Sequence, residues 1–152
     1  MGSEMRMNYT MMGDTVNLAA RLESSAKQYG VYNFVGENIY EVAKSQFVFR
    51  FLDFVKVKGK NIPVKVYELV SNKNDASNEM IKLIKFFEKG LDYYYKQEWD
   101  SAIKQFQKSE SLEDHFESRN TNPSNIYIER CKMFSNNPPG ENWDGVWAMT
   151  SK

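Results

Sequence analysis

YTMMGDTVNLAARLE, residues 9–23, is the stretch that decides the fold of the first half of the chain. Residues 6–12 favour a strand, and we expect the following helix over residues 14–29. Good N-cap residues stand at the start of this helix, and Gly30 is its stop signal. Small and aliphatic residues recur at helical spacing within it, so one face of the helix is expected to be buried.

The rest of the first half alternates short strand and helix signals. Residues 32–35 predict a strand and residues 37–45 an amphipathic helix. Residues 47–57 and 63–70 are rich in Val, Phe and Tyr, and the turn residues between them predict a β-hairpin. This order of strands and helices predicts an α+β fold.

A polar stretch, SNKNDASN at residues 71–78, separates this half from a second one. It contains no branched aliphatic or aromatic residue, which is typical of a linker. We therefore expect two units, residues 1–72 and residues 73–152, with the boundary near residue 74.

The second half predicts helices and an ordered tail. The helices are expected over residues 78–96, 99–112 and 123–134. We expect Phe86 and Tyr93, with Tyr94 as a further member, to form the aromatic face of the first helix. Gly90 and Tyr93, followed by Ala102 and Phe106, match the middle of the tetratricopeptide pattern. One such hairpin cannot bury its own apolar face, so it must pack on the first half, the tail or a partner.

Composition limits the classes of function. The 152 residues include 20 Lys and Arg against 20 Asp and Glu, so binding to nucleic acid or anionic lipid is not expected. Arg50 and nearby lysines alternate with aromatic residues, as in single-strand binders, but the neutral charge outweighs that pattern. The single Cys fits a reducing compartment, and no apolar run reaches the roughly 18–20 residues of a membrane span. We expect a cytoplasmic chain.

Asn17 and Arg21 are the first candidate site residues. They are four positions apart in the expected helix, so they lie one above the other beside its apolar face. An amide and a guanidinium near a helix N-terminus can bind an anion and a hydroxyl group. The alternative is a solvated helix face on which Arg21 pairs with a nearby carboxylate.

The segment at residues 9–23 resembles the signature of class III nucleotidyl cyclases, which include adenylate and guanylate cyclases. The resemblance continues through VGE at residues 35–37 and through FVFRFLDFVKVKGKNIPVKVYEL at residues 47–69, which is similar to the closing hairpin of the family. Residues 1–8 resemble the lead-in to the signature. The resemblance implies that residues 1–72 are the C-terminal part of a ferredoxin-like cyclase catalytic domain.

The same resemblance implies a role for four residues. Asn17 would orient the ribose, and Arg21 would stabilise negative charge on the α-phosphate in the transition state. Thr10 stands where the family selects the purine, and Thr there resembles adenylate cyclases, so ATP is expected rather than GTP. Lys58 would hold the triphosphate; its alternative role is a solvated charge in a hairpin turn.

The upstream half of the family's domain has no counterpart in this chain. That half carries the metal-binding carboxylates, so Mg²⁺ or Mn²⁺ would be held outside this chain, and this chain alone is predicted to be inactive. Asp14, Glu23 and Asp53 are interpreted instead as an N-cap, a helix-surface charge and a strand-face charge. Family members build each site across a dimer interface, so a homodimer is expected.

The tail, PSNIYIERCKMFSNNPPGENWDGVWAMT at residues 123–150, resembles an extension found after the cyclase domain of some bacterial membrane-anchored cyclases. The parent would then reach the membrane only through upstream segments, with this portion in the cytoplasm. Trp143, Val146 and Trp147 are expected to pack over the helical hairpin. Cys131 is interpreted as a small buried hydrophobic residue.

Two further expectations follow from the truncation. A sheet that lacks half of its strands exposes hydrogen-bonding edges, so strand exchange or dimerisation is expected. The alternative function is a non-catalytic interaction module, in which the helical hairpin docks a partner and the cyclase-like half is vestigial.

Overall fold

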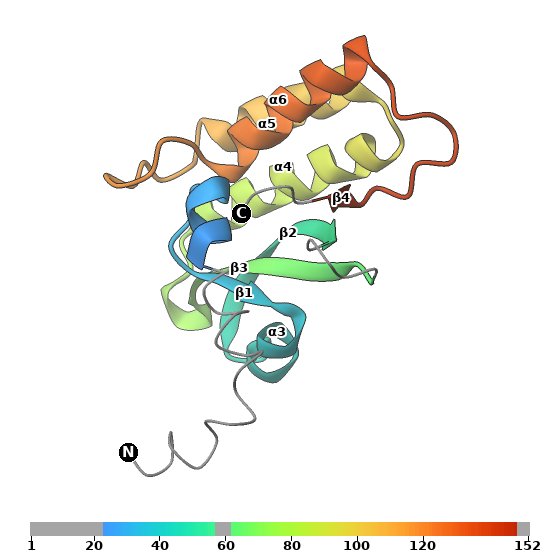
Figure 1. Ribbon diagram of the computed structural model, residues 1–152. Coiled ribbons are helices and arrows are strands. Elements are labelled where there is room, and N and C mark those ends of the chain that lie inside the picture. The colour runs from blue at the N-terminus through green and yellow to red at the C-terminus, as the bar shows by residue number, and fades with distance from the viewer. Residues whose placement is uncertain (1–22, 57–61, 149–152) are drawn as a thin grey trace.

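The computed structural model describes residues 23–56 and 62–148, and it consists of a small sheet with helices on both sides (Figure 1). Residues 23–29 are helical and precede the first strand. The remaining elements are β1 (Phe34–Gly36), α3 (Glu37–Ala43), β2 (Phe47–Lys56), β3 (Val64–Asn72), a 3₁₀ turn (Lys73–Asp75), α4 (Asn78–Tyr95), α5 (Trp99–Glu110), α6 (Pro123–Asn136) and β4 (Trp147–Ala148). Helices α4, α5 and α6 lie on one side of the sheet and α3 lies on the other.

The predicted hairpin is confirmed in its two strands. The sheet has the order β1-β3-β2-β4, in which β3 is antiparallel to both β1 and β2. Arg50 lies opposite Glu68 and Phe51 opposite Tyr67, and irregularities in the register fall on either side of these pairs. The turn at residues 57–61 lies outside the described residues.

The expected stop of the first helix is confirmed at Gly30, which has a positive φ of 74°. A Cβ atom there would lie only 2.0 Å from the carbonyl oxygen of Thr121. Glycine therefore permits both the left-handed turn and the close passage of the chain that precedes α6. The strand expected over residues 6–12, and the helix before residue 23, lie outside the described residues.

The predicted linker is largely structured. Ser71 and Asn72 continue β3, where they lie opposite Val48 and Phe47 of β2. The 3₁₀ turn follows, and the Ser77 side chain then caps α4 by accepting the Met80 N–H at 3.1 Å. The stretch at residues 71–78 between the two halves is therefore ordered, because strand pairing and helix capping use its polar groups.

The three long helices are confirmed, and the aromatic face of α4 needs correction. Phe87 and Tyr94 are fully buried, whereas Phe86 and Tyr93 are only half-buried. Phe86 is followed by Phe87 and Tyr93 by Tyr94, so the sequence did not show which member of each pair faces the core. In the structure the second member of each pair does. A Cβ atom on Gly90 would lie 2.6 Å from the Phe106 ring, so this glycine brings α4 and α5 close together.

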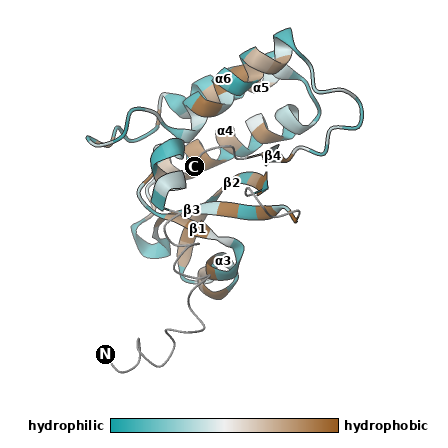
Figure 2. Cartoon of the chain, viewed as in Figure 1, coloured by the Kyte–Doolittle hydropathy of each residue, from teal (hydrophilic) through white to brown (hydrophobic). Residues whose placement is uncertain are grey.

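The core of the helical half extends to α6 and to the tail. Its buried members are Phe87, Leu91, Tyr94, Ala102, Phe106, Tyr127, Ile128 and Cys131. Cys131 is fully buried, as expected, and burial raises the pKa of its thiol to about 12. In the sheet, Figure 2 shows hydrophobic and hydrophilic residues interspersed along β3.

The tail packs over the helical half and also joins the sheet. Trp143 lies 5.2 Å from Tyr94 and 5.4 Å from Phe134 between ring centroids, and Trp147 lies 6.2 Å from Phe134. The expected packing over the helical hairpin is thus confirmed for Trp143, whereas the Trp147 ring lies against α6 and the packing of Val146 stays a prediction. The structure adds that β4 pairs in parallel with β2, with Trp147 opposite Val55. The tail therefore covers an edge of the sheet built by the first half.

None of the helices within residues 23–56 and 62–148 combines the length and the apolar character needed to cross a membrane.

Candidate functional site

The four predicted site residues lie outside the described part of the chain. Thr10, Asn17 and Arg21 fall within residues 1–22, and Lys58 falls within residues 57–61. Their roles stay predictions. The described residues do show what surrounds the two segments that lead to them, namely the helix at residues 23–29 and β2.

A buried polar cluster joins these two segments to α6. Arg130 Nη2 lies 2.8 Å from Asp53 Oδ2 and donates a hydrogen bond of 3.1 Å to the Tyr29 hydroxyl. The Tyr29 hydroxyl in turn donates to Asp53 Oδ2, and the Phe54 N–H donates to Asp53 Oδ1 at 2.8 Å. Asp53 is fully buried and Arg130 is 6 % exposed. Each charge therefore depends on the other and on these bonds to offset the loss of water.

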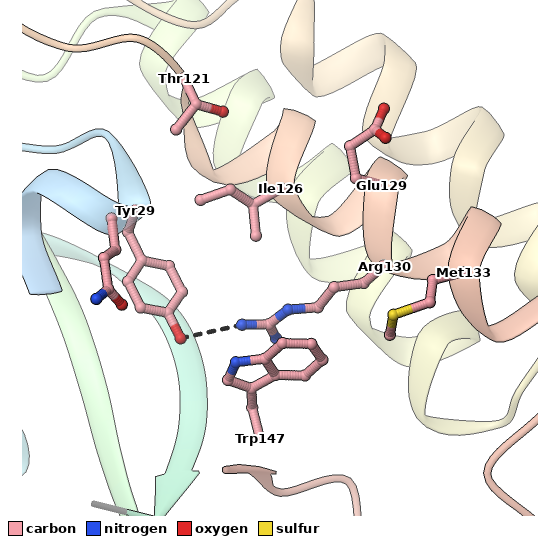
Figure 3. Close-up of a pocket in the computed structure, with 8 residues that line it drawn as sticks. Tyr29, Thr121, Ile126, Glu129, Arg130, Met133 and Trp147 are labelled. Atoms are coloured by element: carbon pink, nitrogen blue, oxygen red, sulfur yellow. Dashed lines mark hydrogen bonds between the residues drawn. The ribbon is translucent and has the colours of Figure 1, made fainter. Parts of the chain in front are cut away.

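Aromatic rings lie against the Arg130 guanidinium, and Figure 3 shows one of them, the ring of Trp147. The central carbon of the guanidinium lies 3.8 Å from the centroid of the Trp147 ring and 4.8 Å from that of Tyr127. Nε and Nη1 have no hydrogen-bond acceptor among the described residues. Attraction to the faces of aromatic rings thus replaces hydrogen bonds over part of the group.

The environment of the cluster shifts the pKa values of Arg130 and Tyr29. Burial is the largest single influence and would lower the pKa of Arg130, but Asp53 and the surrounding tyrosines together outweigh it and hold the pKa well above its ordinary value. Burial, reinforced by the charge of Asp53, raises the pKa of Tyr29 well above 10. Arg130 therefore stays charged and Tyr29 stays protonated at physiological pH, so the cluster is suited to fixing geometry and not to transferring protons.

A cavity of about 350 Å³ opens beside this cluster, between the helix at residues 23–29, α6 and β4. Tyr29, Ile126, Arg130, Met133 and Trp147 are among the residues that line it, and Figure 3 shows them from these three elements. The free guanidinium atoms, Nε and Nη1, are buried under aromatic rings and have almost no exposed surface. A ligand in this cavity would therefore not reach these donors in the observed conformation.

A second buried cluster joins the sheet to the loop after α5. Arg50 donates to Glu68 Oε1 from Nε at 2.9 Å and to Glu113 Oε2 from Nη1 at 2.6 Å. Glu113 Oε2 also accepts the Ser124 hydroxyl at 2.6 Å. The Arg50 guanidinium lies 4.8 Å from the Phe87 ring centroid and the residue is 3 % exposed. Arg50 is thus a structural residue with no surface for nucleic acid.

The described residues do not fit a metal ion. No three His, Cys, Asp or Glu side chains gather as a metal site requires anywhere in residues 23–56 or 62–148. Asp53, interpreted from the sequence as a strand-face charge, is fully buried and bonded to Tyr29 and Arg130, so that interpretation was wrong. A carboxylate inside the apolar run at residues 51–55 signals a buried partner, but nothing local identifies Arg130 as that partner.

The comparisons with known proteins identify the class that the first half resembles. Residues 1–71 match the family model described as "Adenylate and Guanylate cyclase catalytic domain". This segment contains the predicted site residues and also β1, α3, β2 and most of β3. The class III cyclase resemblance inferred from the sequence is therefore confirmed for this half.

Three individual relatives are each named as an adenylate cyclase. The chain is 31 % identical over 134 residues to "Adenylate cyclase, terminal-differentiation specific" of Dictyostelium discoideum, which covers 86 % of this chain and 6 % of that protein. It is 39 % identical over 69 residues to "Adenylate cyclase 1" of Rhizobium meliloti, covering 45 % of this chain and 10 % of the relative. It is 37 % identical over 71 residues to "Adenylate cyclase" of Anabaena cylindrica, with 45 % and 14 % coverage.

The chain spans only 6 % to 14 % of the length of these relatives, so their whole activities are not transferred to it. The Dictyostelium match is longer than the 71 residues of the family model, so the similarity reaches into the helical half. The tetratricopeptide likeness of that half and its bacterial origin stay predictions. No solved structure matches the chain.

Proposed function

We propose that this chain supplies the C-terminal part of the catalytic domain of a nucleotidyl cyclase and that the complete domain converts ATP, in preference to GTP, to the 3′,5′-cyclic nucleotide and pyrophosphate. The match of residues 1–71 to the cyclase catalytic family carries this proposal. The adenylate cyclase names of the relatives support ATP as the substrate.

In this proposal four residues of the chain act on the nucleotide. Asn17 orients the ribose, and Arg21 stabilises the charge that develops on the α-phosphate, a contribution of about 10²–10³ in rate. Thr10 contacts the purine and Lys58 holds the triphosphate. The helix end at Tyr29 and the strand β2, which are both described, would be the scaffold for the helix that carries Arg21 and the hairpin that carries Lys58.

The proposal assigns the metal to another part of the protein. As the cyclase resemblance implies, Mg²⁺ or Mn²⁺ would be held by the upstream half of the family's domain and not by this chain. We therefore expect this chain alone to be inactive, and we expect the complete site to form in a homodimer. A cytoplasmic location, with any membrane contact made by upstream segments, belongs to the same proposal.

The test is to reconstitute the domain. The chain is co-expressed with the missing upstream half, and formation of cyclic AMP and cyclic GMP from the Mn²⁺-triphosphates is measured. We expect cyclic AMP from the complex, none from this chain alone, and a loss of about 10²-fold or more in Arg21→Ala. Lys27→Ala is the matched control, because Lys27 is an exposed cation in the same predicted helix.

The opposite result would favour the interaction module. A folded complex that forms neither product would contradict the cyclase proposal. In the structure the apolar face of the helical hairpin is already covered by α6 and Trp143, so a partner is not needed to bury it. This intramolecular packing supports the cyclase proposal over a module that uses the same face for docking.

A further inference from the structure

The cluster around Arg130 joins four separate segments of the chain. Tyr29 is the last helical residue of the helix at residues 23–29, and Asp53 lies in β2. Arg130 comes from α6, and Trp147 comes from β4. Figure 3 shows the Tyr29 hydroxyl, the Arg130 guanidinium and the Trp147 ring converging on one point.

Two of these segments lead directly to the proposed site residues. Tyr29 follows Arg21 by eight residues in the predicted helix, about 12 Å along a helix axis. Asp53 precedes Lys58 by five residues along β2 and the following turn. The described ends of both segments are therefore tied to each other by the same buried ion pair and hydrogen bonds.

We propose that Arg130 of the helical half is a positioning residue of the cyclase, which fixes the helix that carries Arg21 relative to the hairpin that carries Lys58. The inference rests on the proposed function. Arg130 touches neither substrate nor reacting atoms. It acts by directing one nitrogen, Nη2, to oxygens of both segments at 2.8 Å and 3.1 Å.

The energetics of buried ion pairs favour positioning over stability as the role of Arg130. A buried pair gains little net stability, because the attraction mainly repays the cost of removing both charges from water. The directed bonds do define one mutual arrangement of Tyr29 and Asp53. Well-packed apolar residues would fill this space without such directional preference, so geometry is the property that the ion pair adds.

The tail strengthens the same arrangement. The Trp147 ring covers the guanidinium at 3.8 Å, and β4 pairs with Val55 and Lys56, the last residues of β2 before the turn. The two-residue strand β4 thus pairs with the end of β2, and its Trp147 ring covers the guanidinium that binds Asp53 of the same strand. The helical half, including its tail, is in this view a working part of the catalytic domain.

The test uses the reconstituted complex of this chain with its upstream half. Arg130→Lys keeps the charge and removes the planar group, and Tyr29→Phe removes one hydroxyl. We expect kcat to fall about tenfold in each variant, because misplacement of a catalytic group by an ångström costs up to about 10² in rate. The KM for Mn²⁺-ATP should change by a smaller factor than kcat, since every binding group is retained.

Arg119→Lys is the matched control. Arg119 also reaches from the helical half to the first half, where its Nε donates to the Val31 carbonyl at 2.9 Å, but it contacts neither Asp53 nor Tyr29 through any bond described above. We expect its kcat to stay near that of the wild type. An equal loss of kcat in this control would overturn the proposal, because loosening between the halves would then explain the effect.

A second measurement separates positioning from misfolding. Hydrogen exchange in Arg130→Lys should become faster in residues 23–29 and 50–56 together, with α4 and α5 unchanged. Faster exchange confined to α6, or unchanged kcat in both variants, would overturn the positioning role. An inactive wild-type complex would instead overturn the proposed function, and the catalytic role of Arg130 with it.

Discussion

Arg50 and Arg130 are both buried between the two halves of the chain, and they are satisfied in different ways. Arg50 faces two carboxylates, and all three of its nitrogens donate hydrogen bonds to them. Arg130 faces one carboxylate, and aromatic rings occupy the space around its remaining nitrogens. Arg50 therefore neutralises an excess of negative charge, whereas Arg130 belongs to a balanced pair.

The comparison predicts that removal of Arg50 has the larger effect. Arg50→Met would leave Glu68 and Glu113 buried without a cation, at a cost of about 3–5 kcal/mol in the free energy of unfolding. Urea denaturation measures this loss. Lys44→Met is the control, because Lys44 pairs with Glu41 on the surface and both side chains are 52 % exposed. A cost below about 1 kcal/mol would show that the two carboxylates do not need Arg50.

Removal of Arg130 should cost less. In Arg130→Met the Asp53 carboxylate keeps the bonds from the Tyr29 hydroxyl and the Phe54 N–H, so we expect a loss of about 2–3 kcal/mol. Combining Arg130→Met with Asp53→Asn should restore part of that stability, because the unpaired charge is removed as well. The comparison fails if Arg130→Met destabilises the protein as much as Arg50→Met in the same denaturation experiment.

The smallest effect concerns pH. Burial raises the pKa of Glu68 above its ordinary value of 4.5, and the nearby Arg50 only partly opposes this. The Glu68 carboxyl group therefore binds a proton more tightly in the folded state than in the unfolded state. The associated stability is fully present below pH 4.5 and is lost as the pH rises through the raised pKa.

The free energy of unfolding, measured by urea denaturation at a series of pH values from 4.5 upward, tests this expectation. In Glu68→Gln the free energy of unfolding should fall less steeply as the pH rises, with a slope smaller by at most about 1.4 kcal/mol per pH unit. Glu117→Gln, at an exposed position in the loop before α6, should leave the slope unchanged. A wild-type curve that rises with pH over this range would contradict the assignment.

The sequence predicted those parts of the molecule that depend on local signals. The β2–β3 hairpin and helices α4, α5 and α6 follow from periodicity, caps and turn residues close to each element. Asn122, for example, caps α6 by accepting the Asn125 N–H at 2.8 Å. Such signals involve neighbours within a few residues, and they are readable in one sequence.

The features that the sequence did not reveal depend on distant partners. Asp53 pairs with Arg130, which lies 77 residues further along the chain, and no local pattern specifies that pairing. The two-residue strand β4 is too short for an alternation to indicate it. The candidate site residues Thr10, Asn17, Arg21 and Lys58 lie outside the described residues, so their assignment still depends on the family resemblance.

The pairing of β4 with β2 has a consequence for the order of events during synthesis. Trp147 lies 92 residues after Val55, so the ribosome finishes the first half well before its sheet edge can be covered. Until the tail emerges, the nascent chain presents an open strand edge and an Asp53 side chain without its arginine. Completion of this part of the fold must therefore wait for contacts of long sequence separation, and such contacts slow folding.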